Sequence, residues 1–373
     1  MDKKNLTIAI HGAEQSEGGV YNVLNSFSTG LLKGFKAIGV SAFSTRECIE
    51  KNINFNMSIG FNRNEINIWQ KILSNNITNI MWTVDSAFGQ NIDVIEQFSS
   101  FEKFVLFEVT PADIQAVNLY LPTLKHGYIP HATDTELWQK TGYKKENDIV
   151  FFSSVQDYEA IYQQLKETMP QLVYELMMQI REISLKNPQL TFWQICETLK
   201  KALGLELDKE QYKMLFKNIS YPLELEQKVK MIQALSDFNV KIYGNDVWKK
   251  YITGNIEYVG SCNTSESVEI MEKSKISLHC HPVALGLGLH ERILNASAVE
   301  TFSLVSNSPS INAEFGNAFG YFNHATFEDI AEKAQYYLNN DDERQELAKT
   351  AKNIVNQRHT WANRAESIMA ITE

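Results

Sequence analysis

The chain has 373 residues, of which 44% are apolar, and a formal net charge of −10 at pH 7. This length exceeds that of one ordinary core, so the sequence predicts two domains. The negative charge excludes general binding to nucleic acid or to an anionic membrane, because no excess of cations is present to neutralise phosphates.

The four cysteines form no CxxC pair, which excludes the usual zinc and redox motifs. The N-terminal run LTIAIHG is too short for a signal sequence or a membrane span. We therefore expect a cytoplasmic protein that is not integral to a membrane, with reduced cysteines that fill cores.

Residues 1–140 alternate between short apolar runs and helical spacing. The predicted strands are Leu6–His11, Gly39–Phe43, Asn79–Thr83, Phe104–Glu108 and Gly127–Pro130, with a helix over Val20–Ala37. Strands that alternate with helices predict a parallel sheet covered on both faces, with ligands beyond the carboxyl ends of the strands.

A boundary is expected between His131 and Asn147, with an N-cap and turn at Thr133 or Asp134 and then a polar connector. A second domain over 147–355 starts with the strand Asp148–Ser153. Helical periodicity over about 157–237 predicts an inserted group of helices with its own small core. The strand pattern then returns at Val240–Tyr243, Ile256–Val259, Ile276–His281, Thr301–Ser306 and Gly320–Phe322, and Phe327–Thr372 is mainly helical.

The stretch from Ile276 to Ser308 is the most informative part of the second domain. A buried strand leads into a loop bracketed by Gly286 and Gly288, and a helix then opens near His290. The first turn of a helix presents unpaired N–H groups, and Arg292 adds a bidentate donor, so this place suits a phosphate. The alternative is a surface Glu291–Arg292 pair at the start of a helix.

Seven segments occur in the order seen in CgeB-like glycosyltransferases, which are relatives of the group 1 glycosyltransferases. They are IPHATDTELW, DIVFFSS, VKIYGNDVW, NIEYVGSC, MEKSKISLHCH, LHERILNASA and RHTWANRAESI. The chain resembles this family over its C-terminal two-thirds, and the helices after FFSS resemble the family too. The N-terminal third shares only a strand, the Gly18–Gly19 loop and a helix.

The resemblance implies the GT-B architecture, an α/β fold in which two Rossmann-like domains face each other across a cleft. It implies a nucleotide-sugar donor held mainly by the second domain, an acceptor against the first, and no catalytic metal or other cofactor. It also implies that a terminal helix, residues 356–373, crosses back to the first domain, anchored by Trp361.

The chain differs from this family at two positions that are usually acidic. The residue three positions after Arg292 is usually acidic and binds the ribose, but here it is Asn295. In the group 1 relatives a second glutamate lies eight positions earlier, where this chain has Leu287. Asn295 can still hydrogen-bond a hydroxyl, although it carries no charge.

The candidate catalytic residues serve two purposes. Arg292 and His290 would contact the diphosphate or the sugar, because negative charge builds up on the nucleotide as it departs. Asp85 and Glu108 each follow a predicted strand and could be the general base for an acceptor hydroxyl, or could simply be a solvated or capping acid.

The other candidates follow strand ends. Donor-binding candidates are Tyr243, Gly244, Asn245, Gly260, Ser261, His281, Gly288, Glu291 and Asn295, and acceptor-binding candidates are His11, Glu17, Gly18 and Gly19, with Glu14 nearby. His279 and His281 point to the same face of their strand. They have no evident set of further zinc ligands, so we expect no metal site and a core position for His279.

The sequence therefore predicts a glycosyltransferase that moves a sugar from a nucleotide-sugar to a glycan, a protein or another hydroxyl acceptor. A non-catalytic sugar-nucleotide or glycan-binding subunit that works beside a partner transferase is the first alternative, since both acidic positions differ. An epimerase or phosphorylase on the same fold is the second. An oligomer is possible, and no nucleic acid is expected as a partner.

Overall fold

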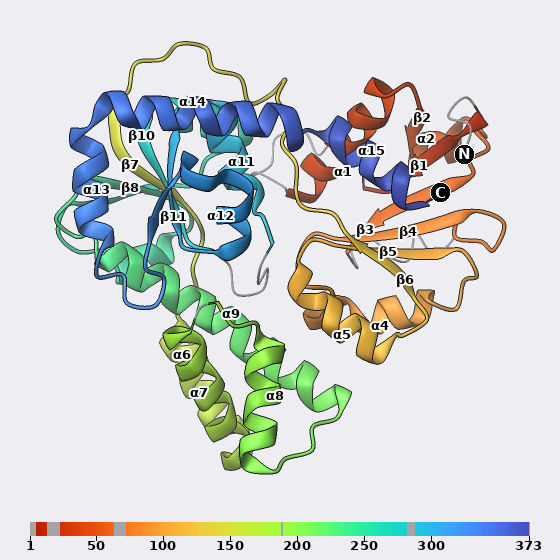
Figure 1. Ribbon diagram of the computed structural model, residues 1–373, viewed down its shortest axis with the longest axis horizontal. Coiled ribbons are helices and arrows are strands. Elements are labelled where there is room, and N and C mark those ends of the chain that lie inside the picture. The colour runs from red at the N-terminus through yellow and green to blue at the C-terminus, as the bar shows by residue number, and fades with distance from the viewer. Residues whose placement is uncertain (1–4, 13–22, 63–71, 188, 282–287, 373) are drawn as a thin grey trace. The chain divides into compact units, whose positions relative to one another are not determined.

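The computed structural model describes residues 5–12, 23–62, 72–187, 189–281 and 288–372, which form two compact units (Figure 1). The first unit contains residues 1–136, 288–291 and 355–373, and the second contains 137–287 and 292–354. The segment Gly288–Glu291 thus groups with the first unit, although we expected it inside the second domain.

In the described part of the first unit, a parallel sheet has the strand order β2-β1-β3-β4-β5-β6. Its strands are β1 (Thr7–Ile10), β2 (Ser41–Ser44), β3 (Met57–Phe61), β4 (Thr78–Thr83), β5 (Phe104–Glu108) and β6 (Lys125–Tyr128). The connecting helices are α1 (Val23–Ala37), α2 (Thr45–Glu50), α4 (Ala87–Phe98) and α5 (Ile114–Tyr120). The strand order reverses around β1, so the carboxyl ends of β1 and β3 mark the place where such a sheet binds ligands.

The second unit contains a parallel sheet with the strand order β12-β11-β10-β7-β8-β9. Its strands are β7 (Asn147–Phe152), β8 (Val240–Tyr243), β9 (Ile256–Gly260), β10 (Ser274–His279), β11 (Phe302–Ser306) and β12 (Gly320–Phe322). The later helices are α10 (Thr264–Glu272), α11 (Glu291–Ala298), α12 (Pro309–Phe315), α13 (Ile330–Asn339) and α14 (Asp341–Arg358). Here the order reverses between β7 and β10, which places the expected ligand position at their carboxyl ends.

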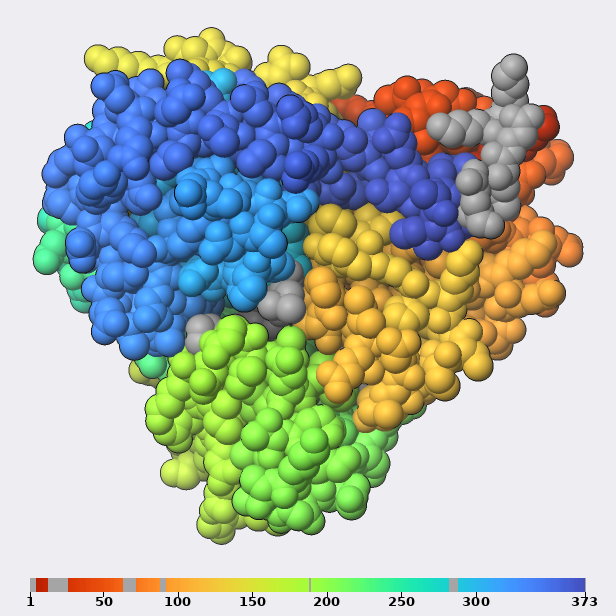
Figure 2. All heavy atoms as spheres, in the orientation of Figure 1, coloured from red at the N-terminus to blue at the C-terminus, as the bar shows by residue number. Residues whose placement is uncertain are grey.

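The predicted helical insertion consists of α6 (Tyr158–Thr168), α7 (Gln171–Lys186), α8 (Phe192–Leu203) and α9 (Lys209–Gln233). In Figure 2 these helices form the green part of the surface. It has its own small core, as predicted: Trp193 packs on Tyr212 with ring centroids 4.9 Å apart. Glu226 is buried among these helices and pairs with Arg181 and with Lys230. Because the buried carboxylate has two cationic partners, the pairing ties α7 to α9.

The terminal helix α15 (Trp361–Thr372) belongs to the first unit, as predicted, and packs on α1. Trp361 is 4% exposed and lies 5.1 Å from Phe27 between ring centroids. A Cβ at Gly30 would lie 2.2 Å from the Trp361 indole nitrogen, and one at Gly34 would lie 2.3 Å from the Trp361 carbonyl oxygen. Both glycines are therefore required for this close helix contact.

The sequence analysis missed the strand β3 because Ser58 and Gly60 interrupt its apolar run, although all five residues are buried.

The turn expected at Thr133 or Asp134 is confirmed, since the Asp134 carboxylate accepts a hydrogen bond from the Glu136 backbone N–H. The N-cap expected there is wrong, because no helix follows, and Thr133 instead forms a bridge with Thr360.

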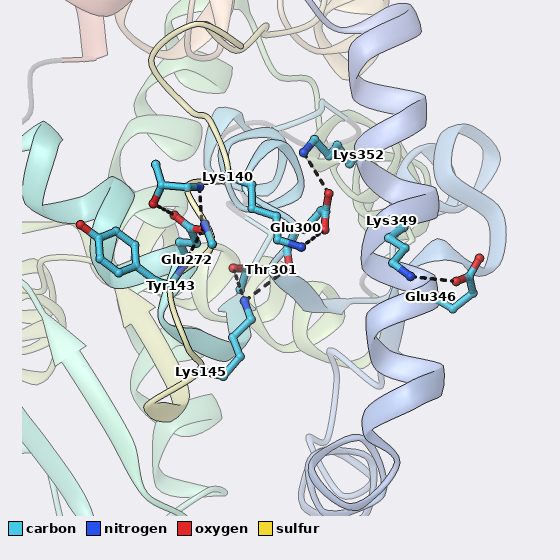
Figure 3. A network of polar contacts seen from close by, with 11 residues as sticks. Lys140, Tyr143, Lys145, Glu272, Glu300, Thr301, Glu346, Lys349 and Lys352 are labelled. Atoms are coloured by element: carbon cyan, nitrogen blue, oxygen red, sulfur yellow. Dashed lines mark hydrogen bonds and ion pairs between the residues drawn. The ribbon is translucent and has the colours of Figure 1, made fainter.

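The connector before β7 is fastened to the second unit by polar contacts (Figure 3). The buried Glu272 carboxylate accepts hydrogen bonds from three successive backbone N–H groups, those of Thr141, Gly142 and Tyr143, at 2.8, 2.6 and 3.1 Å. The Lys145 ammonium lies 3.2 Å from the Thr301 hydroxyl, and burial lowers the pKa of Lys145 to about 8. These contacts lie at the amino ends of the strands, opposite the expected ligand position.

Candidate functional site

Arg292 lies at the ligand-binding edge that the strand order of the second unit predicts. Its guanidinium donates a hydrogen bond to the Phe152 carbonyl oxygen, at the carboxyl end of β7. Arg292 also lies in the first turn of α11, the helix that follows β10. The residue is half-buried, so a cation is held where the two central strands end and where the partial positive charge of a helix N-terminus favours an anion.

A second cation, which the sequence analysis missed, acts at the same edge. Lys228 on α9 is 8% exposed at its side chain, and its ammonium lies 2.5 Å from a Glu224 carboxylate oxygen. Burial raises the pKa of the Cys280 thiol to about 12, whereas the charges of Lys228 and Arg292 act to lower it and that of Glu224 acts to raise it. Arg292 and the Lys228–Glu224 pair therefore both act on Cys280, directly after β10.

The loops after β8 and β9 are held by backbone contacts. Gly244 donates its N–H to the Gly260 carbonyl oxygen at 2.9 Å, and a Cβ at Gly244 would lie only 2.0 Å from the Ser153 carbonyl oxygen. Gly260 has a φ of +127°, and the β8–β9 pairing shifts register at Tyr243. These two glycines are therefore required by the backbone itself, whatever else they contact.

Tyr243 and Asn245 differ in what their side chains do. The Tyr243 ring stacks on Phe152 at 5.2 Å between centroids, which gives an aromatic pair at the ends of β7 and β8. The Asn245 amide oxygen accepts from the Val155 N–H at 3.1 Å, and its amide nitrogen donates to the Val155 carbonyl at 2.7 Å. Asn245 thus joins two loops, while Ser261 follows β9 directly.

Histidines gather after β10 and β12. The His281 backbone N–H donates to the Ser306 hydroxyl at 2.7 Å. Burial lowers the pKa of His324 to about 3, and the charge of His281 acts in the same direction, so His324 is neutral at neutral pH. His279 is buried, with its Nε2 3.4 Å from the Ser303 hydroxyl, in agreement with the core position that we predicted.

On and before α11, the described residues include Gly288 and Asn295, both of which are buried. Asn295 is 3% exposed. Gly286 and Leu287 lie outside the described residues, and so do the acceptor candidates Glu14, Glu17, Gly18 and Gly19.

The corresponding edge of the first unit carries His11 and Asp85. His11 is buried directly after β1, and its backbone N–H donates to the Ile59 carbonyl at 2.8 Å. Asp85 is exposed after β4, and its carboxylate accepts from the Asn62 amide at 3.1 Å. The carboxyl ends of β1, β3 and β4 therefore bring polar groups to the ligand-binding edge of this sheet.

Glu108 lies in a different environment from Asp85. It is completely buried at the end of β5, and one of its oxygens lies 2.7 Å from His126 Nδ1. Burial raises the pKa of Glu108 despite the opposing effect of His126, while the hydrogen bond that His126 makes to Glu108 raises the pKa of His126. The fold therefore encloses Glu108 with a histidine partner.

Glu291 lies between two histidines in the first unit. The same oxygen, Oε2, lies 3.1 Å from His131 Nδ1 and 3.0 Å from His290 Nδ1. His131 is also 3.0 Å from the Val84 carbonyl through Nε2, and it is 2% exposed. The alternative of a surface Glu291–Arg292 pair is wrong, because Glu291 is 3% exposed.

Among the described residues, no group of three or more His, Cys, Asp or Glu side chains could hold a metal ion. The expectation that the protein acts without a catalytic metal stays a prediction.

Comparison with known proteins gives a family match and several similar solved structures. Residues 226–370, fewer than half of the chain, match a family described as glycosyl transferase-like. Two similar solved structures are sucrose-phosphate synthase from Thermosynechococcus elongatus (TM-score 0.60, 9% identity, 98% of each chain covered) and T4 phage BGT with its UDP-glucose substrate (TM-score 0.55, 13% identity, 99% and 100% covered). A third is HepE from Anabaena with UDP and glucose (TM-score 0.55, 9% identity, 98% of each chain covered). No curated protein sequence matches the chain.

These matches confirm the predicted fold class. The chain has the α/β GT-B fold, with two parallel six-stranded sheets among the residues described, and its C-terminal part resembles glycosyltransferases as expected.

Proposed function

We propose that this chain is a glycosyltransferase that moves a sugar from a nucleotide-sugar donor to a hydroxyl group of a glycan, a protein or another acceptor. The observation that supports this most directly is Arg292, which meets the end of β7 in the first turn of α11. It lies within the segment that matches a glycosyl transferase-like family.

The two cations of the second unit suit a diphosphate. Arg292 offers a planar, bidentate group, whereas Lys228 offers a point charge that Glu224 holds in place. When the bond between the sugar and the phosphate breaks, negative charge builds up on the leaving nucleotide, and these cations would stabilise that charge. In this proposal the aromatic pair Phe152–Tyr243 lies beside the nucleotide part of the donor.

Asn295 bears on the choice of donor. In the proposal, it replaces a charged contact to the ribose with a neutral hydrogen bond, so the donor affinity rests more heavily on the diphosphate. UDP-glucose is a reasonable first donor, since BGT of T4 phage is described with that substrate and HepE with UDP and glucose. We propose a reaction that needs no bound metal.

The test is nucleotide release from UDP-, GDP-, dTDP- and CMP-sugars, with and without a cell extract as a source of acceptors. Arg292→Ala should lower release by about 10²-fold, as is typical when one charge-stabilising donor is removed. The matched control is Arg46→Ala, because Arg46 is exposed on α2 and pairs with Glu50, four residues further along the same helix. Equal release by wild type and Arg292→Ala would contradict the proposed role.

The accessory-subunit alternative is supported by Asn295 and Leu287, which stand at the two positions that are usually acidic in the family. It predicts nucleotide binding by calorimetry with no release from any donor, even in the presence of the extract. A location in the cytoplasm also stays a proposal. No helix within the described ranges is long and apolar enough to span a membrane.

A further inference from the structure

Gln227 on α9 is a buried amide whose oxygen has no hydrogen-bond partner among the residues that the structure describes. The residue is 2% exposed, and its Oε1 is enclosed without an N–H or O–H group that donates to it. Buried polar groups in folded proteins are almost always hydrogen-bonded, because an acceptor removed from water without a partner destabilises the fold. An unpaired amide at this position therefore calls for a reason other than folding.

The neighbours of Gln227 on α9 do not supply the missing hydrogen bond. Residues three and four positions apart lie on the same face of a helix, which places Leu223, Glu224 and Met231 beside Gln227. Leu223 and Met231 are buried apolar side chains, and an ionised Glu224 carboxylate can only accept hydrogen bonds. The group that donates to Oε1 must therefore come from outside this helix face.

The same part of α9 carries the charges that we assign to the diphosphate. The Glu224 carboxylate, three residues before Gln227, lies 2.5 Å from the Lys228 ammonium. The charges of Glu224, Lys228 and Arg292 all influence the pKa of the Cys280 thiol, directly after β10. Since all of these residues belong to the second unit, Gln227 lies beside the proposed diphosphate position within one compact unit.

We propose that Gln227 determines specificity for the nucleotide-sugar, because its amide oxygen accepts a hydrogen bond from a hydroxyl group of that substrate. This inference rests on the proposed function. The diphosphate cannot be the partner, since its ionised oxygens only accept, whereas the hydroxyl groups of the sugar and of the ribose can donate. A substrate that lacks the hydroxyl leaves the amide unpaired, so the site rejects it.

The first experiment needs no substrate and compares melting temperatures. If Gln227 served only the fold, Gln227→Met would lower the melting temperature. If the amide is kept for the substrate, methionine should leave the melting temperature unchanged or raise it, because it has a similar shape and no polar atom to bury. A variant that melts below wild type would overturn the proposal.

The matched control is Gln233→Met on the same helix. Gln233 is exposed, and its amide nitrogen donates to the Tyr251 carbonyl oxygen at 3.4 Å. This glutamine thus has a partner within the protein, in contrast to Gln227. Its replacement should leave the affinity for nucleotide-sugars unchanged.

The second experiment identifies the hydroxyl group by calorimetry. The probes are UDP-glucose and analogues that each lack one hydroxyl of the sugar or of the ribose. Wild type should bind one analogue at least about tenfold more weakly than UDP-glucose, and Gln227→Met should bind the two equally. The position of that hydroxyl shows whether Gln227 contacts the sugar or the ribose.

Two results distinguish this inference from the proposed function. If Gln227→Met loses as much affinity as wild type for every analogue, the amide contacts no hydroxyl and only the role of Gln227 is overturned. Where wild type prefers a GDP-, dTDP- or CMP-sugar, the analogues are made from that compound. A wild type that binds none of these nucleotide-sugars overturns the proposed function, and the role of Gln227 falls with it.

Discussion

The carboxyl edges of the two sheets carry opposite chemistry. At the edge of the second unit, Arg292 and Lys228 gather positive charge around the end of β10. The first unit instead holds Asp85 after β4 and Glu291 beside two histidines. Two parallel sheets of the same size can therefore serve different steps of one reaction. The residues that follow the strands, and not the strands themselves, decide which charges lie at each edge.

This division predicts that catalysis and binding will respond differently to mutation. His290→Gln should lower turnover by about tenfold or more with little change in UDP affinity, because UDP lacks the sugar that His290 is proposed to contact. Arg292→Ala should weaken both turnover and UDP binding. Turnover assays paired with calorimetry would test the contrast, and loss of UDP binding in His290→Gln would contradict it.

The second cation allows a finer test within the second unit. Lys228→Met should weaken UDP binding by about tenfold, the effect of losing one interaction of about 1.4 kcal/mol. The single change also leaves Glu224 without its cation, so a Glu224→Gln, Lys228→Met double variant is the control. If the double variant recovers full affinity, the charge of Lys228 makes no contribution to diphosphate binding.

Asp85 provides a sharper test of the first unit. Asp85→Asn should lower kcat by less than about tenfold, because the amide can keep the contact to Asn62 and an exposed acid is a weak base in water. A loss of about 10²-fold or more would assign the general base to Asp85.

Lys145 lies at the opposite end of the second sheet from Arg292. We therefore expect it to affect stability and not nucleotide binding. Its folded pKa of about 8 lies below the ordinary value of 10.5, so the unfolded chain binds more protons between those values. Stability should therefore rise with pH, by about 1 kcal/mol between pH 7 and pH 9.

Chemical denaturation of wild type and Lys145→Met across this pH range would measure the effect. The rise should be absent in the variant, because methionine does not titrate. An identical slope in both proteins would show that other groups cause it, and UDP binding should be the same in both.

Much of the fold followed from the sequence because buried parallel strands are short apolar runs with clear ends. β5, β8 and β12 match the predicted residues, and β3 was missed because Ser58 and Gly60 interrupt its pattern. The helical insertion was also predictable, since helical spacing continues across its breaks.

The site was only partly predictable. Arg292 could be proposed because it begins a helix after a strand, which is a local pattern. Lys228 could not, since it lies among other charged residues of α9 and only its burial and its effect on Cys280 distinguish it. No local signal distinguishes it, because the buried residues of α9 also include Glu226 and Gln227.

The sequence by itself determined the α/β class, the segments that become strands and the position of Arg292, because these depend on neighbours in the chain. Only the tertiary structure decided that His131 and Glu291, 160 residues apart, share a hydrogen bond. It likewise decided that Asn245 joins two loops and that Glu108 is enclosed with His126. Burial and protonation depend on groups distant in the chain, which no local pattern records.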